Sequence, residues 1–371
     1  MSGTKHSLGA LALLGSLALA LASCGAAVQV HADPPTDPPA VPAASPTTVP
    51  AVRATAPTTG GTTKPASRPA GRLGAPLPVP AALASFGGAG GGAQAAWRPA
   101  GRLVGGKPAV YETSLVPPGG TQPAGIAWMD THRLAARLYS GSGSPGGGPY
   151  RYSAPVAPAQ AASLVAAFNG GFKMSDSPGG YYTEGHVVAP LVTGAASLVI
   201  YAGGRVDIGS WGSDVTMTPS VVSVRQNLVP LVAGGGPTAQ AQSTDWQAWG
   251  STCGASSCAA SVPGIEHQWR SGLGVTANGA LVYAGGPALD PLQVAQLLVR
   301  AGVVRGMELD INPYWTVFAT YAPAAGGLAS ASNGSRLGSG TVQGPATFFE
   351  SSWARDFVTV SARTPQMASA R

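Results

Sequence analysis

"GMELDINPYW", residues 306–315, carries a polar side chain at every second position of an apolar segment. The alternation runs in the order Met307, Glu308, Leu309, Asp310, Ile311 and Asn312. Successive side chains of a β-strand point to opposite faces, so this spacing predicts a strand with both carboxylates and the amide on one face. The alternative, a solvent-facing row on an edge strand, is disfavoured because the flanking "GVVRGM" and "WTVF" look interior. We therefore expect the acidic row to form the floor of a binding pocket or an active site.

The segments before this strand read as one helix and several hairpins. "DPLQVAQLLVRAG" (290–302) predicts a helix with Asp290 as N-cap, Pro291 at the first helical position and Gly302 at the end. "SGLGVTANGALVYAGG" (271–286) predicts a hairpin in which Asn278-Gly279 forms a type I′ turn. Many hairpins and few helices predict an α+β fold, a single domain around a mixed, mostly antiparallel β-sheet.

An export signal is expected at the start of the chain, in residues 1–23. Residues 8–23 form a largely apolar run of 16 behind Lys5 and His6, which is short for a spanning helix and typical of a secretory signal. The run ends in "LASC", which resembles a bacterial lipoprotein signal with Cys24 as the lipidated residue. The alternatives are an ordinary secretory signal or an uncleaved anchor. The chain is expected to be exported, and either anchored to the outer face of the cell membrane or secreted.

Residues 24–104 are expected to be a disordered tether, because they are mostly Ala, Pro, Gly, Thr and Ser. Residues 25–104 alone hold 14 of the chain's 34 prolines. A flexible chain of this length has a root-mean-square reach of roughly 50 Å, enough to hold a domain clear of a membrane. The folded domain is then expected over 105–362, with a tail over 363–371.

The charge distribution argues against a nucleic-acid partner. Residues 1–104 carry seven Lys or Arg against two Asp, a net charge of +5, and residues 105–371 carry fourteen basic against thirteen acidic residues, a net charge of +1. The predicted domain is therefore nearly neutral and has no basic block for a phosphate backbone.

Cys253 and Cys258, in "STCGASSCAA", are the other two cysteines of the chain. In an exported protein, this close spacing in a Gly/Ser-rich loop favours a local disulfide. A metal site is the weaker alternative, since His267 is the one nearby imidazole and no second Cys pair exists. No metal and no cofactor are expected.

Three segments together resemble the phosphodiester glycosidase family. They are "FNGGF" (168–172), "RSGLGVTANGALVY" (270–283) and "VVRGMELDIN" (303–312), in the family's order and after a lone helix. The likeness covers about residues 105–360. In the family, Leu309-Asp310 would be followed by a run of glycines and a serine, whereas here Ile311, Asn312 and Pro313 follow.

The chemistry of sugar-1-phosphodiester hydrolysis assigns roles to the matched residues. The reaction needs a carboxyl group at the anomeric carbon or on the attacking water, together with donors that hold the phosphate. Asp310 and Glu308 supply carboxyls, and their mutual repulsion is expected to raise the pKa of Glu308 well above that of an ionised Asp310. The expected donors are the Arg270 guanidinium, Asn169 and the amides of Gly170 and Gly171.

Other residues are weaker candidates for binding the substrate. Tyr182, Glu184 and His186 lie in the Gly-rich segment "GGYYTEGHVV" (179–188), which predicts either an aromatic pocket rim or a simple surface loop. Asn312 is expected to face the pocket from the end of the acidic row.

These observations lead to two functional expectations from different classes. The first is an exported hydrolase that cleaves a glycosyl phosphodiester in the cell envelope. The second is a non-catalytic envelope lipoprotein that uses the same fold to bind glycan or polymer phosphate, which the lost glycine run favours. The motifs of serine hydrolases, zinc proteases and phosphate-binding loops are missing from the sequence, which disfavours those classes. The oligomeric state stays open.

Overall fold

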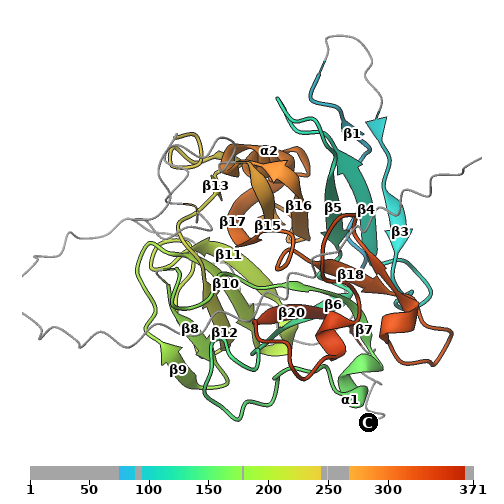
Figure 1. Cartoon of the computed structure of the whole chain (residues 1–371), viewed down its shortest axis with the longest axis vertical. Helices are drawn as coiled ribbons and strands as arrows, with labels where there is room; N and C mark the ends of the chain where they lie inside the picture. The colour runs from blue at the N-terminus through green and yellow to red at the C-terminus, as the bar shows by residue number, and fades with distance from the viewer. Residues whose placement is uncertain (1–74, 88–93, 178, 244–248, 250–266, 364–371) are drawn as a thin grey trace, which may run out of the picture. The chain divides into compact units, whose positions relative to one another are not determined.

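The structure, a computed structural model, describes residues 75–87, 94–177, 179–243, 249 and 267–363, which all belong to one compact unit, Ala66–Arg371. Twenty β-strands and two α-helices occur in these residues (Figure 1). The fold is therefore essentially all-β, and the expected α+β class is wrong. The physical reason is that apolar residues alternate in short runs throughout, and a helix-length apolar stripe occurs once.

The largest sheet has eight strands, in the order β14-β13-β17-β15-β16-β5-β4-β3. Its strands are β3 (Arg98–Ala100), β4 (Val110–Leu115), β5 (Ala124–Met129), β13 (Val232–Ala233), β14 (Gly236–Pro237), β15 (Gln268–Thr276), β16 (Leu281–Leu289) and β17 (Val303–Ile311). All of its strand pairs are antiparallel.

Two five-stranded sheets and a two-stranded ribbon complete the architecture. One sheet has the order β11-β10-β12-β8-β9, the other β19-β18-β7-β20-β6, and the ribbon is β1-β2. Their strands are β1 (Leu83–Ala84), β2 (Gln94–Ala95), β6 (Leu134–Tyr139), β7 (Leu164–Asn169), β8 (Tyr181–Thr183), β9 (His186–Ala189), β10 (Ala196–Tyr201), β11 (Val206–Ser210), β12 (Val221–Gln226), β18 (Phe318–Tyr321), β19 (Gly334–Arg336) and β20 (Phe357–Ala362). The helices are α1 (Pro158–Ala161) and α2 (Pro291–Arg300), with 3-10 turns η1 (Ala202–Gly204), η3 (Ala331–Asn333) and η4 (Thr347–Phe349).

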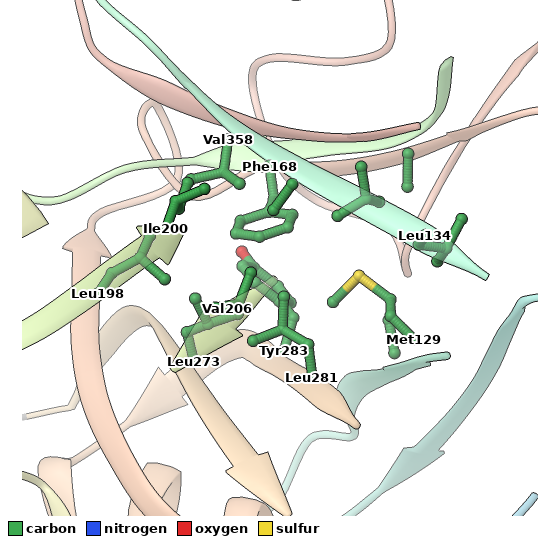
Figure 2. Packing of buried hydrophobic residues seen from close by; sticks show 14 of the residues in the cluster. Met129, Leu134, Phe168, Leu198, Ile200, Val206, Leu273, Leu281, Tyr283 and Val358 are labelled. Atoms are coloured by element: carbon green, nitrogen blue, oxygen red, sulfur yellow. The ribbon is translucent and has the colours of Figure 1, made fainter. Parts of the chain in front are cut away.

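The core lies where the three larger sheets meet. Figure 2 shows Phe168, Leu198, Tyr283 and Val358, one from each of β7, β10, β16 and β20, pointing toward one another. Alternate side chains of the eight-stranded sheet face this core, and the others face a second cluster that includes α2. The central strands of this sheet are therefore buried on both faces, as the continuous burial of β5 and most of β16 reflects, whereas the outer strands β3, β4 and β14 are more exposed.

β17 occupies an interior position of this sheet, hydrogen-bonded to β13 on one side and β15 on the other. Met307 and Leu309 belong to the core between the sheets, whereas Ile311 belongs to the second cluster. Glu308 pairs with Gly272 and Ile311 pairs with Arg270, so the register of β17 against β15 shifts between Glu308 and Ile311 and the two-residue alternation does not continue through Asp310. The prediction of an interior strand is confirmed, but the expected single face for Glu308 and Asp310 is not.

α2 packs in the second cluster, on the face of the sheet away from the core between the sheets, and begins as predicted. Asp290 is the N-cap, Pro291 opens the helix, and Asp290 and Gln293 form a reciprocal capping box. The helix lies so close to β15 that a Cβ atom on Gly272 would stand 2.7 Å from Val294 Cγ1 and 3.1 Å from Leu298 Cδ1.

Replacing Gly272 by Ala is expected to destabilise the fold by about 1–3 kcal/mol, the usual effect of forcing an extra carbon into a packed core. The added methyl group would separate α2 from the strand that carries Arg270. Thermal unfolding measures the effect, and Gly236→Ala is the matched control because nothing lies within 4 Å of its added Cβ. Equal melting temperatures for the two variants would contradict the close packing of α2.

The turn of the 271–286 hairpin differs from the expected type I′. The Gly279 N–H donates to Thr276 O at 2.9 Å, and only Gly279 of the Asn278-Gly279 pair has a positive φ, at 88°. A type I′ turn needs a positive φ at both central residues. The predicted hairpin is thus present, but its loop is longer than two residues, with Gly279 in the single left-handed position.

The packed body begins before residue 105, so the expected tether boundary at 104 is too late. Leu77, Leu83 and Val104 are buried, and β3 pairs with β4 at the edge of the eight-stranded sheet. The segment before residue 105 contains few large apolar residues, so the strands β1, β2 and β3 could not be recognised from its sequence. The signal, Cys24, Cys253, Cys258 and residues 364–371 lie outside the described residues. Within the described part of the chain, no helix has the length and apolarity to cross a bilayer.

Candidate active site

The three motif segments meet at one end of β17. Asn169, the last residue of β7, donates from Nδ2 to Ser271 Oγ at 3.0 Å, and that hydroxyl donates to Asp310 O at 2.7 Å. Asn169 Oδ1 accepts from Tyr283 Oη at 2.9 Å and from Val317 N at 3.1 Å. The structure therefore brings the Asn169, Arg270 and Asp310 segments together, while the Asn169 amide itself is occupied in joining two sheets.

Arg270 and Glu308 form a fully buried ion pair. Arg270 Nη1 lies 2.7 Å from Glu308 Oε1, and both side chains have 0% exposure. The guanidinium also donates to Leu289 O at 3.0 Å and to Trp249 O at 2.9 Å. Its hydrogen bonds are thus directed into the protein, which favours a structural role over the expected phosphate clamp. Burial raises the pKa of Glu308 to about 7, although Arg270 lowers it.

Asp310 pairs with an arginine that the sequence motifs do not include. Arg355 Nη2 lies 2.5 Å from Asp310 Oδ2 and 3.0 Å from Gly171 O. The side chains of the pair are 5% and 4% exposed, and the Trp315 ring lies over the guanidinium at 4.9 Å. Arg355 Nε is buried and has no hydrogen-bond partner among the described residues. One guanidinium donor beside Asp310 thus has no acceptor among the described residues.

The electrostatic environment of Asp310 differs from the expected one. Burial raises its pKa to about 7, Arg355 lowers it, and the carboxylate that raises it further is Asp356 rather than Glu308. The expected separation between a protonated Glu308 and an ionised Asp310 is therefore wrong, because the pKa of each is raised to about 7. Glu308 pairs with Arg270 and Asp310 pairs with Arg355. The pKa of each carboxyl is therefore set by its burial and its own arginine, and not by repulsion between the two carboxyls.

A third buried ion pair supports the glycine turn after Asn169. Arg225 Nε lies 2.8 Å from Asp356 Oδ2, and the Gly170 N–H donates to Asp356 O at 3.0 Å. A Cβ on Gly170 would stand 2.2 Å from Asp356 Oδ2, and one on Gly171 would stand 3.0 Å from the Arg225 guanidinium. The absence of side chains at Gly170 and Gly171 therefore leaves the space that this ion pair fills. The Gly170 N–H, which was expected to bind substrate, already donates a hydrogen bond to Asp356 O.

Asn312 turns the chain at the end of the acidic row. It has a φ of 68°, and its Oδ1 accepts from Tyr314 N at 2.9 Å and Trp315 N at 3.1 Å. Asparagine tolerates this left-handed conformation better than most residues. It thus adopts a backbone conformation that glycine adopts readily, and its side chain holds the turn rather than facing a ligand as expected.

Tyr182, Glu184 and His186 lie in a different sheet, on or between β8 and β9. Glu184 accepts hydrogen bonds from the backbone amides of Arg151 and Tyr152, and His186 contacts the Tyr150 ring edge-on with centroids 5.9 Å apart. In the described part of the chain, no hydrogen bond or ion pair joins these three side chains to Asp310 or Arg355. The structure does not bring them into the candidate site.

Sequence reasoning missed Arg225, Arg355 and Asp356. Each is a charged residue within or beside an apolar strand, in "VVSVRQN" (221–227) and "ARDFVTV" (354–360). Charge inside an apolar run was the available signal, since buried charges need partners. Within the described residues, no group of three His, Cys, Asp or Glu side chains is placed to hold a metal ion.

Comparison with known proteins identifies no family for this chain. No protein-family profile and no curated protein matches it. Three solved structures are similar, each at low identity. The catalytic domain of zebrafish N-acetylglucosamine-1-phosphodiester alpha-N-acetylglucosaminidase, auto-inhibited by its pro-peptide, is 15% identical with a TM-score of 0.39, over 74% of this chain and 90% of that one.

The other two similar structures have no stated activity. A hypothetical protein from Synechocystis is 11% identical with a TM-score of 0.38, over 72% of this chain and 64% of that one. A protein of Burkholderia pseudomallei thought to be exported is 12% identical with a TM-score of 0.33, over 67% of this chain and 74% of that one. At these values the likeness establishes neither a family nor an activity.

Three carboxyls, of which Glu308 and Asp310 are buried and Glu112 is half-buried, predict a decrease of stability with rising pH. Burial raises the pKa of Glu112 from 4.5 to about 7, as it does for Glu308, and that of Asp310 from 3.8 to about 7. At pH values between the pKa of the unfolded chain and the raised pKa of about 7, the folded chain keeps protons that the unfolded chain has released. The free energy of unfolding therefore falls as the pH rises through this window. Melting temperatures at about pH 5 and about pH 7 measure this difference. Glu112→Gln should reduce it, and the exposed control Glu350→Gln should not; an unchanged or rising melting temperature would contradict the shifts.

Proposed function

We propose that the protein is a hydrolase that cleaves a glycosyl phosphodiester, with Asp310 as the reacting carboxyl and Arg355 as the phosphate-binding cation. The observation that carries this proposal is the unpartnered, buried Nε–H of Arg355 beside a carboxyl whose pKa is near neutral. A guanidinium suits phosphate oxygens, and a carboxyl with a pKa near the working pH suits proton transfer.

The proposed reaction is a displacement at the anomeric carbon. Water attacks this carbon, the bond from carbon to the bridging phosphate oxygen breaks, and the phosphate monoester leaves with the bonding pair. Ionised Asp310 accepts the proton of the water, and Arg355 stabilises the charge of the leaving phosphate. Asn169 and Ser271 hold the β17 backbone at Asp310 through their hydrogen bonds.

Glu308 and Arg270 support this site without touching substrate in our proposal. Their side chains have 0% exposure, so a bound sugar phosphate could not reach them in this conformation. The pair instead fixes β15 beside β17, the two strands that carry Ser271 and Asp310. Their expected roles as supporting acid and phosphate clamp become positioning roles.

A second candidate function is binding of glycan or polymer phosphate without catalysis. The observation that favours it is the closed state of the site, since the Asp310 side chain is 4% exposed and already ion-paired. An assay of sugar release from a panel of sugar-1-phosphodiesters tests the two candidates against each other. Release of sugar by the wild-type chain supports the hydrolase. Binding of phosphorylated glycan with no release on the panel supports the binding protein.

Export and lipid anchoring belong to the same proposal, which places the substrate in the cell envelope. The ordered signal that ends in "LASC" motivates Cys24 as the lipidated residue. Cys24→Ala is expected to release the protein from the membrane fraction or to block its processing, because the acyl chains are the proposed anchor. Cell fractionation and intact mass measure both effects, with Ser23→Ala as the control. Unchanged fractionation and mass would exclude lipidation. The Cys253–Cys258 disulfide stays a prediction, which the mass of the non-reduced peptide tests.

A further inference from the structure

A groove outside the candidate active site carries two arginines without carboxylate partners. It has a volume of about 500 Å³, in the range of small-molecule sites. It lies between β6 and the β10–β12 region, and its lining includes Arg137, Arg151, Tyr152, Glu184, Tyr201 and Gly203. We call it the arginine groove. None of the residues of the Asp310 cluster lines it.

The arginine side chains of this groove are held in place by Tyr152. Arg137 Nε donates to Tyr152 Oη at 2.9 Å, and the Arg137 and Arg151 guanidinium groups lie 5.3 and 5.4 Å from the Tyr152 ring centroid. The Tyr139 ring packs against Tyr152 at 5.4 Å. These contacts restrict both guanidinium groups before any ligand binds, which lowers the entropic cost of binding.

Glu184 does not neutralise the two arginines by direct pairing. Its two carboxylate oxygens accept the backbone N–H groups of Arg151 and Tyr152, at 2.8 and 3.1 Å. Glu184 has a φ of 51° and lies in the turn between β8 and β9. From this turn its carboxylate holds the backbone of residues 151–152. In the described residues, no carboxylate lies within ion-pair distance of the Arg137 or Arg151 guanidinium.

A third arginine increases the positive potential. Arg363 Nη1 donates to Gly203 O at 2.5 Å, at the rim of the groove. Burial lowers the pKa of Arg363 and the charge of Arg137 lowers it further, although Asp130 opposes this. Arg363 does not line the groove itself, but its positive charge lies near that of Arg137 and adds to the potential felt by an anion.

We infer that the arginine groove binds a sugar that carries a phosphate or a carboxylate group. The guanidinium groups suit either anion through paired charge-assisted hydrogen bonds. The volume exceeds what a bare anion fills, and the lining also includes Tyr201, the η1 backbone and Ser223, although the Ser223 hydroxyl already pairs with Thr183 Oγ1 and Gly203 O already accepts from Arg363. Hydroxyl groups of a sugar would meet these groups. This site is separate from Asp310 and does not depend on the hydrolase proposal.

Calorimetric titration of the purified full chain tests the inference. The probes are glucose 1-phosphate, glucuronate, glucose and inorganic phosphate, which separate the two anion sources from the sugar and from the bare anion. We expect both anionic sugars to bind, glucose to show no binding, and inorganic phosphate to bind more weakly than glucose 1-phosphate. Added salt should weaken binding of the anionic sugars.

Variants localise the binding to the groove. Arg151→Gln changes an exposed residue and should leave folding intact, and Arg137→Gln removes the half-buried partner. Each is expected to weaken binding of both anionic sugars about tenfold or more, the effect of losing a charge-assisted hydrogen bond. Arg98→Gln, on the exposed strand β3, is the matched control and should bind as the wild type does. Equal binding of glucose and glucose 1-phosphate, inorganic phosphate binding as tightly as the sugars, or wild-type affinity in Arg151→Gln would overturn the inference.

Discussion

Asp310→Asn is expected to reduce turnover of a sugar-1-phosphodiester by roughly 10²–10⁴-fold, the usual scale for loss of a general acid or base. Asparagine keeps the shape of the side chain and can still accept a hydrogen bond from Arg355, but it cannot take a proton from water. The KM should change less than kcat, because Arg355 remains to hold the phosphate.

The measurement is sugar release under single-turnover conditions, with thermal unfolding as the check on folding. Asp176→Asn is the matched control, since Asp176 is exposed and its side chain accepts a hydrogen bond from the neighbouring Ser175. A folded Asp310→Asn variant with wild-type turnover would exclude Asp310 as the reacting group. The hydrolase proposal would then lose its central residue.

Arg270→Ala is expected to destabilise the protein by about 3–5 kcal/mol, because it leaves the Glu308 carboxylate buried without its partner. The loss corresponds to a fall of about 10 °C in melting temperature for a domain of this size. The double variant Arg270→Met with Glu308→Leu should recover part of the stability, since it removes both charges together. An exposed phosphate clamp, as the sequence pattern suggests, would show the opposite behaviour: lost binding at an unchanged melting temperature.

Thermal unfolding of Arg270→Ala, the double variant and the control Arg98→Ala separates these cases. Arg270 also holds Leu289 O and Trp249 O, so full recovery is not expected from the double variant. If the double variant were less stable than Arg270→Ala alone, the ion pair would not be the cause of the loss.

The elements that could be predicted from sequence are those with a local cause. The α2 helix has its N-cap and proline in the sequence, and the sequence of β17 alternates apolar and acidic residues over 307–311. The fold class could not be predicted correctly, because the number of sheets depends on which strands pair over long distances. The β7–β20 and β15–β17 pairs, for example, join segments far apart in the chain.

The candidate site was predicted in part for the same reason. The motifs located Asn169, Arg270, Glu308 and Asp310 near one another, since each lies on a recognisable strand or turn. The ion pairs of the two carboxyls, Glu308 with Arg270 and Asp310 with Arg355, could not be predicted, because Arg355 reaches Asp310 only through the packing of two sheets. Burial of the whole cluster likewise follows from tertiary packing and not from any local pattern.

The early start of the packed body determines where the domain can be cut. A fragment that began at residue 105 would lack β3 and expose the hydrogen-bonding edge of β4, next to the apolar side chain of Val110. It would also lose the backbone amide of Leu77 that donates to Asp130 at 3.1 Å. An open strand edge of this kind pairs readily with a second copy, so such a truncation invites aggregation. Proteolytic shedding or recombinant trimming that preserves the folded domain must therefore cut before residue 75.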